Sequence, residues 1–217
     1  MNKKGIAGLI SALLVLMVVL TGCGEPDRVA PDKAADYVMN ALIKGEDTDK
    51  LEDTFGSDYG NFESDFKDGF ISSFKSQLTS TTTADLDQEV NDFYDAFMAQ
   101  MKKEATYTAK VTNDDKEKPE VKINVKGLDM ASVQNELTQK LTDAVTADPS
   151  LATDQDALMK KTMELYTEAI QNAKAVGTGT DVTMKLEPNS SDDSQWKMTN
   201  ETEFMNNVAM ALYMGGY

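Results

Sequence analysis

The spacing of apolar residues along this chain changes twice from a helical repeat to a two-residue alternation. Phenylalanines fall every fourth residue across residues 62–74, and an apolar stripe over residues 86–101 keeps a helical spacing. Both stripes are typical of amphipathic helices. Residues 105–112 and 121–126 then alternate apolar with polar side chains around a charged turn, which predicts a β-hairpin with one buried face.

Further elements on either side of this block follow the same order of helices and then a hairpin. Helices are expected at 32–44, at 48–55, from about 130 to near 148, at about 154–176 and at 204–212, and a second hairpin pairs 182–186 with 195–198 around a turn at 188–194.

Blocks of helices separated by hairpins predict an α+β fold. We expect a single α+β domain over residues 32–217, in which the two hairpins join as an antiparallel sheet packed against several amphipathic helices. Its two helix-plus-hairpin halves cover about 32–127 and 128–217. Two small tandem domains split near Gly127 are the alternative, although no proline-rich linker separates the halves.

The N-terminal segment has the features of an export signal. Lys3 and Lys4 precede an apolar stretch at 6–20 that contains no charged residue. This stretch is shorter than the ~20 apolar residues that a membrane-spanning helix needs, and it is typical of a signal peptide. Leu20-Thr21-Gly22-Cys23 follows and resembles the bacterial lipobox, in which the cysteine is acylated and becomes the new N-terminus.

We therefore predict a lipoprotein signal peptide at 1–22 and a lipidated N-terminus with a tether at 23–31. Cys23 is the only cysteine, so no disulfide can form within the chain. Two or more acyl chains give a stable anchor where one does not. The predicted location is the extracytoplasmic face of the cell membrane, and the alternative is an uncleaved membrane anchor with an incidental cysteine.

The chain is strongly acidic. It has 37 acidic and 21 basic residues, and loss of residues 1–22 removes two lysines, which leaves a net charge near −18. Such a charge argues against nucleic acid as a partner, since phosphate binding needs clustered lysine and arginine. It also argues against a domain that lies flat on an anionic lipid surface.

The residues that usually carry chemistry are missing. The chain has no histidine, which removes the commonest catalytic base and the commonest zinc ligand. Asp47, Asp85 and Asp154 each begin a calcium-loop pattern that does not continue, so we expect such acids to cap helices. We predict no catalytic residue, no metal site, no cofactor and no enzymatic activity.

The phenylalanine stripe raises the question of a ligand pocket. If one exists, it should lie between the stripe and the sheet, lined by Phe66, Phe70, Phe74, Tyr107 and Trp196. The alternative is that these aromatic residues are ordinary core, with Trp196 anchoring the sheet to a helix.

Together with the lipobox, the segments at 121–129, 196–198 and 203–204 resemble an uncharacterised family of Gram-positive lipoproteins. That resemblance implies a cystatin-like or nuclear-transport-factor-2-like α+β architecture, with helices packed into the concavity of a bent sheet. It implies no catalytic residues.

The expected function is a non-enzymatic binding or interaction domain for a protein or a cell-envelope component, held at the membrane by its lipid. The alternative is a small-molecule carrier or sensor with an apolar pocket.

The lipid anchor makes a direct prediction. Mass spectrometry of the native protein should find a chain that begins at Cys23 and carries acyl groups. A free thiol at Cys23, or residues 1–22 still attached, would contradict the prediction.

Overall fold

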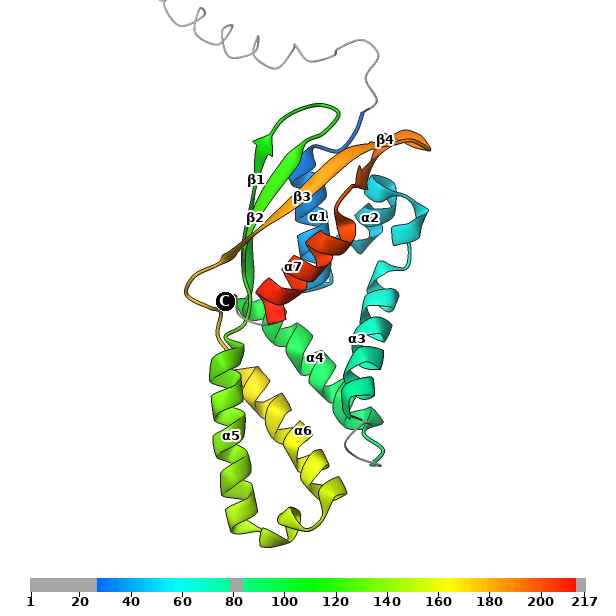
Figure 1. Ribbon diagram of the computed structural model, residues 1–217. Coiled ribbons are helices and arrows are strands. Elements are labelled where there is room, and N and C mark those ends of the chain that lie inside the picture. The colour runs from blue at the N-terminus through cyan, green and yellow to red at the C-terminus, as the bar shows by residue number, and fades with distance from the viewer. Residues whose placement is uncertain (1–26, 79–83, 214–217) are drawn as a thin grey trace, which may run out of the picture.

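The computed structural model describes residues 27–78 and 84–213 of the chain (Figure 1). The predicted signal peptide and the predicted lipidation site, Cys23, lie outside these ranges. Within them, no helix is both long and apolar enough to cross a membrane.

The described residues form an α+β fold, as predicted. The α-helices are α1 (Pro31–Lys44), α2 (Thr48–Phe55), α3 (Phe62–Leu78), α4 (Asp87–Glu104), α5 (Met130–Ala147), α6 (Gln155–Asn172) and α7 (Glu201–Tyr213). Short 3-10 helices lie at η1 (Ser57–Tyr59) and η2 (Pro149–Ala152). The strands are β1 (Thr106–Asn113), β2 (Glu120–Lys126), β3 (Thr180–Asn189) and β4 (Asp192–Met198).

The two predicted hairpins join edge to edge in one antiparallel sheet of order β1-β2-β3-β4. The central pairing joins β2 to β3, with Val121 opposite Met184 and Ile123 opposite Val182. Because alternate residues of a strand point to opposite faces, this register places the apolar residues of both strands on the same side of the sheet.

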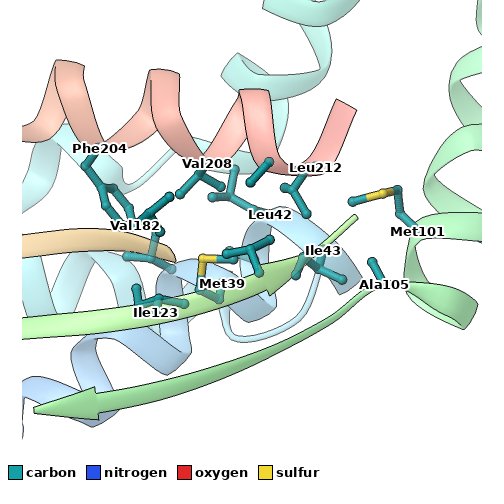
Figure 2. Close-up of a cluster of buried hydrophobic side chains, with 14 of the residues drawn as sticks. Met39, Leu42, Ile43, Met101, Ala105, Ile123, Val182, Phe204, Val208 and Leu212 are labelled. Atoms are coloured by element: carbon teal, nitrogen blue, oxygen red, sulfur yellow. The ribbon is translucent and has the colours of Figure 1, made fainter. Parts of the chain in front are cut away.

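That side of the sheet is covered by α1 and α7. Figure 2 shows Met39 of α1, Ile123 of β2, Val182 of β3 and Phe204 of α7 in one cluster. All four side chains are buried. The core therefore combines elements from both halves of the chain. The predicted boundaries of the signal peptide, the tether and the domain stay predictions.

The opposite face of the sheet is polar and open. Its outward side chains include five lysines, from β1 to β4: Lys110, Lys122, Lys126, Lys185 and Lys197. Lys122 pairs with Asp181 at 2.7 Å and Lys197 with Glu187 at 3.0 Å. This face therefore carries basic side chains in a chain that is otherwise strongly acidic.

Helices α5 and α6, joined by η2, form an arm that extends away from the sheet (Figure 1). The chain enters and leaves the arm side by side, since the Asp129 N–H donates to the Lys174 carbonyl at 2.7 Å and the Val176 N–H to the Gly127 carbonyl at 2.9 Å. At this point the chain passes directly beneath α7, and a Cβ at Gly127 would collide with the backbone of Leu212.

Two predicted boundaries were wrong. The helix expected to reach Val176 ends at Asn172, because Ala175 forms a β-bridge with Leu128 instead of continuing the helix. The turn expected at 188–194 is shorter, because β3 extends to Asn189 and β4 begins at Asp192.

The three acids that were expected to cap helices accept hydrogen bonds from different donors. Asp154 caps α6 by accepting from the Ala157 N–H at 3.0 Å, as expected. Asp85 accepts from the Asp87 N–H at 3.1 Å at the start of α4. Asp47 makes no capping bond and accepts instead from the side-chain amide of Asn40 at 2.7 Å.

The crossing at Gly127 yields a test of the fold. Gly127→Ala should lower the free energy of unfolding by about 1–3 kcal/mol, because its methyl group can be accommodated only if the backbone of α7 shifts. Gly69→Ala in α3 is the matched control, since a Cβ there meets nothing within 4 Å. It should raise stability by about 0.5–1 kcal/mol through helix propensity. Urea denaturation measures both, and equal stability of the Gly127→Ala variant and the unsubstituted protein would contradict the packing of α7.

Candidate functional site

Helix α3 differs from the other long helices because it has no buried residue along its 17 positions. Its four phenylalanines are half-buried rather than enclosed. Two lysines attach it to α4, where Lys75 pairs with Asp87 at 2.6 Å and Lys67 approaches Asp95 at 3.8 Å. The phenylalanine side chains and two ion pairs thus hold helix α3 against the rest of the molecule.

Phe70 is the centre of the aromatic cluster beneath α3. Its ring centroid lies 5.3 Å from that of Tyr94, 5.7 Å from that of Phe97 and 6.2 Å from that of Tyr213. Phe74 stacks on Phe93 of α4 at 4.9 Å. Ring pairs at such distances contribute about 0.5–1.5 kcal/mol beyond the area that they bury.

An open groove follows α3 on the side that faces the end of α7. Its volume is about 470 Å³, within the range of small-ligand sites. It is lined by Asp65, Phe66, Gly69, Phe70, Ser73, Phe74 and Gln77 of α3 and by Tyr213 of α7. We call this site the aromatic groove.

The aromatic groove has an apolar floor and a small polar edge. Three phenyl rings and the Tyr213 ring form the floor, while Gly69 and Ser73 leave space above it. Asp65 is the one charged residue among its lining side chains. This arrangement can bind apolar and aromatic side chains, and it brings together no pair of groups suited to acid–base chemistry.

A second hollow lies on the other flank of α3, between this helix and α1 and α4. Its volume is about 300 Å³, and its lining includes Phe62, Phe66, Tyr94 and Met98. Phe66 therefore borders a hollow on each side of α3.

The structure divides the predicted pocket residues among three places. Phe66, Phe70 and Phe74 line the aromatic groove together, and the groove lining includes no residue of the sheet. Tyr107 lies apart, with its O–H donating to Asn40 Oδ1 at 3.0 Å. Trp196 lies beside the N-terminal segment, so neither Tyr107 nor Trp196 lines the groove.

Trp196 holds the segment that precedes α1. Its Nε1–H donates to the Val29 carbonyl at 2.6 Å, and the Arg28 guanidinium lies 4.8 Å from the ring centroid. Arg28 Nη1 also donates to the Asp193 carbonyl at 2.9 Å. We call these contacts of Arg28, Val29, Asp193 and Trp196 the N-terminal clasp.

Tyr213 and Gly69 are groove residues that the sequence reasoning did not identify. Gly69 stands one residue before Phe70 in the helical stripe, so its missing side chain was a signal of a gap in the helix surface. Tyr213 has no such signal, because only the packing of α7 brings it to α3.

Burial raises the pKa of the tyrosines around the aromatic cluster. Desolvation is the main cause for Tyr94 and for Tyr213, and it is the cause for Tyr166, whose ring centroid lies 4.6 Å from that of Phe93. Desolvation also raises the pKa of Tyr59, which donates to Glu201 Oε1 at 2.6 Å. In the described part of the chain, no group of three or more metal-ligating side chains is placed to hold an ion.

Comparisons with known proteins give one family and one structure of similar fold. A family described as "Domain of unknown function (DUF5105)" matches residues 25–213. No curated protein matches the sequence.

A solved structure described as a "putative lipoprotein (ycdA) from Bacillus subtilis subsp. subtilis str. 168" has a similar fold, with a TM-score of 0.67 and 19% sequence identity. The match covers 83% of this chain and 55% of that one, so this chain corresponds to about half of its neighbour's length. Identity at this level shows the fold alone. The predicted cystatin-like or nuclear-transport-factor-2-like architecture stays a prediction.

The tyrosine pKa values predict alkaline unfolding. In the unfolded chain a tyrosine ionises near pH 10, while burial holds the folded pKa of Tyr166 higher. The contribution of this group to stability should be complete below about pH 10 and should be lost as the pH rises toward the folded pKa. Tyr166→Phe keeps the ring and removes the ionisable group, so it should raise the pH at which circular dichroism reports unfolding. The same midpoint in both proteins would contradict the assignment.

Proposed function

The chain belongs to the DUF5105 family, and we propose that it is a lipid-anchored protein of the extracytoplasmic membrane face that binds a partner without catalysing a reaction. The proposed binding site is the aromatic groove. The proposed partner is a protein segment that presents apolar side chains and positive charge.

The anchor is supported by the sequence before the domain. Cys23 follows an apolar stretch of signal-peptide length and stands at the end of Leu20-Thr21-Gly22. The structural neighbour from Bacillus subtilis is described as a "putative lipoprotein", which supports this part of the proposal.

The partial exposure of the α3 phenylalanine side chains is the observation that carries the binding proposal. Phe66, Phe70 and Phe74 remain partly exposed along one groove, whereas Phe93 and Phe97 of α4 are buried. Exposed apolar patches with a polar rim mark interaction sites, and buried aromatic side chains supply much of the affinity of protein interfaces.

Charge supports a cationic partner. The outward side chains of α3 include the exposed acids Glu63, Asp65 and Asp68, while Lys67 and Lys75 are directed toward carboxylates of α4. The partner would approach a surface of net negative charge. Complementary charge mainly speeds association and excludes wrong partners, while apolar contacts on the groove floor supply affinity.

A small-molecule carrier is the second candidate, and the two hollows beside α3 favour it. Because Phe66 borders both, an apolar molecule that displaced this ring would reach the space on each side of the helix. Native mass spectrometry of the protein purified from its own cells separates the candidates, since a carrier would retain a bound compound of defined mass.

The binding proposal is tested by in-cell photocrosslinking from a benzoylphenylalanine at position 73, inside the groove. A discrete crosslinked protein is expected. Gly69→Leu fills the open space above the floor and should lower the crosslink yield at least about tenfold, the equivalent of 1.4 kcal/mol. Ser72→Leu adds the same side chain at an exposed position outside the groove lining and should leave the yield unchanged.

Two outcomes would contradict this proposal. One is the absence of any crosslinked species above the background of a position-142 probe, which lies on the exposed surface of α5. The other is an equal loss of crosslinking in the Gly69→Leu and Ser72→Leu variants.

A further inference from the structure

We infer that the N-terminal clasp determines which end of the domain faces the bilayer, and that this end, formed by the β1–β2 loop and the β3–β4 turn, lies against phospholipid headgroups. The inference rests on the proposed lipid at Cys23, and it adds an orientation and a contact surface to that proposal.

The clasp shortens the part of the tether that is free of the domain. The sequence predicts a short tether over residues 23–31, and a tether of that length with no contacts to the domain would leave the domain freedom to turn. The clasp removes most of that freedom, because Val29 is bonded to a tryptophan that is only 4% exposed and Arg28 is bonded to Asp193. Immediately afterwards α1 begins at Pro31.

Only the chain before Arg28 then remains to span the distance to the lipid. Four peptide units separate Cys23 from Asp27, and fully extended they reach about 14 Å. The point where the described chain begins must therefore lie within that distance of the acylated cysteine.

The described chain begins at one end of the fold (Figure 1). The hollow beside Trp196 is lined by Val29 and also by Asp114, Lys116 and Pro119 of the β1–β2 loop. The segment before α1 thus reaches the domain beside this loop and β4, at one extreme of the molecule (Figure 1). The arm formed by α5, η2 and α6 lies at the other extreme.

The chemistry of the loop end fits contact with headgroups rather than insertion into the bilayer. Its β1–β2 loop carries Lys116 and Lys118 among the acids Asp114, Asp115 and Glu117. The large apolar side chain that is exposed in the described residues, Met210, belongs to α7 instead. A polar surface of mixed charge stays outside the hydrocarbon, and because its small excess of acids gives no attraction to an anionic leaflet, the short tether is what holds it against the headgroups.

Headgroup quenching in vesicles tests the orientation. Because Cys23 is the only native cysteine, an introduced cysteine is the only free thiol of the acylated full chain. A fluorophore is placed at Ser191→Cys in the β3–β4 turn or at Ala152→Cys in the arm, and both native side chains are exposed. The vesicles contain equal parts of phosphatidylcholine and phosphatidylglycerol, with a nitroxide on a fraction of the headgroups.

The clasped protein should float with the vesicles and show at least about threefold stronger quenching at position 191 than at position 152, since a tether of about 14 Å keeps the loop end at the surface. Trp196→Phe removes the Nε1–H donor and should lower quenching at position 191. Arg28→Ala, which leaves the buried indole in place, should act in the same direction, and circular dichroism confirms that both variants fold.

Each result of the flotation and quenching experiment has a single interpretation. Failure to float shows that the chain carries no lipid, which overturns the anchor of the proposed function and this inference with it. Floating with equal quenching at both positions, or with stronger quenching at position 152, overturns the orientation and leaves the anchor intact. Unchanged quenching at position 191 in both clasp variants shows that the clasp does not set the orientation.

Discussion

The pairing of β2 with β3 determines where the other elements can pack. It joins the two halves of the chain and places Val121, Ile123 and Val125 on the same face as Val182 and Met184. A shift of one residue in this register would turn every one of the moved strand's side chains to the opposite face. Such a shift of β3 would turn Asp181, Thr183 and Lys185 toward the helices in place of Val182 and Met184.

The molecule consequently has surfaces of different character. The inner face of the sheet is closed, while the outer face carries lysines, including Lys110 directly opposite Lys122. Like charges in that position are destabilising, and the ion pair of Lys122 with Asp181 offsets part of the cost. The aromatic groove is the third kind of surface, because its apolar floor lies beside a helix that never becomes fully buried.

Much of the fold follows from residue spacing alone. Alternation located the strands, and the helical stripes located the helices to within a few residues, because burial on one face imposes those periods. The site was predicted only in part. A stripe of phenylalanines has the same spacing whether its helix is enclosed or half-open, so the sequence could not distinguish a core from a groove. Trp196 was assigned to the pocket for a similar reason, since its partner is a backbone carbonyl in the segment predicted as a tether, and residue spacing does not reveal that contact.

The crossing at Gly127 places the base of the arm against the helix that ends at the groove. The chain segments that lead into and out of the arm are bonded to each other beside this glycine, and the Leu128 N–H donates to the Leu212 carbonyl at 3.3 Å. Leu212 immediately precedes Tyr213, whose ring is part of the groove floor. The glycine leaves no side chain between the two backbones, so the crossing that supports the base of the arm also fixes the position of the helix end that carries Tyr213.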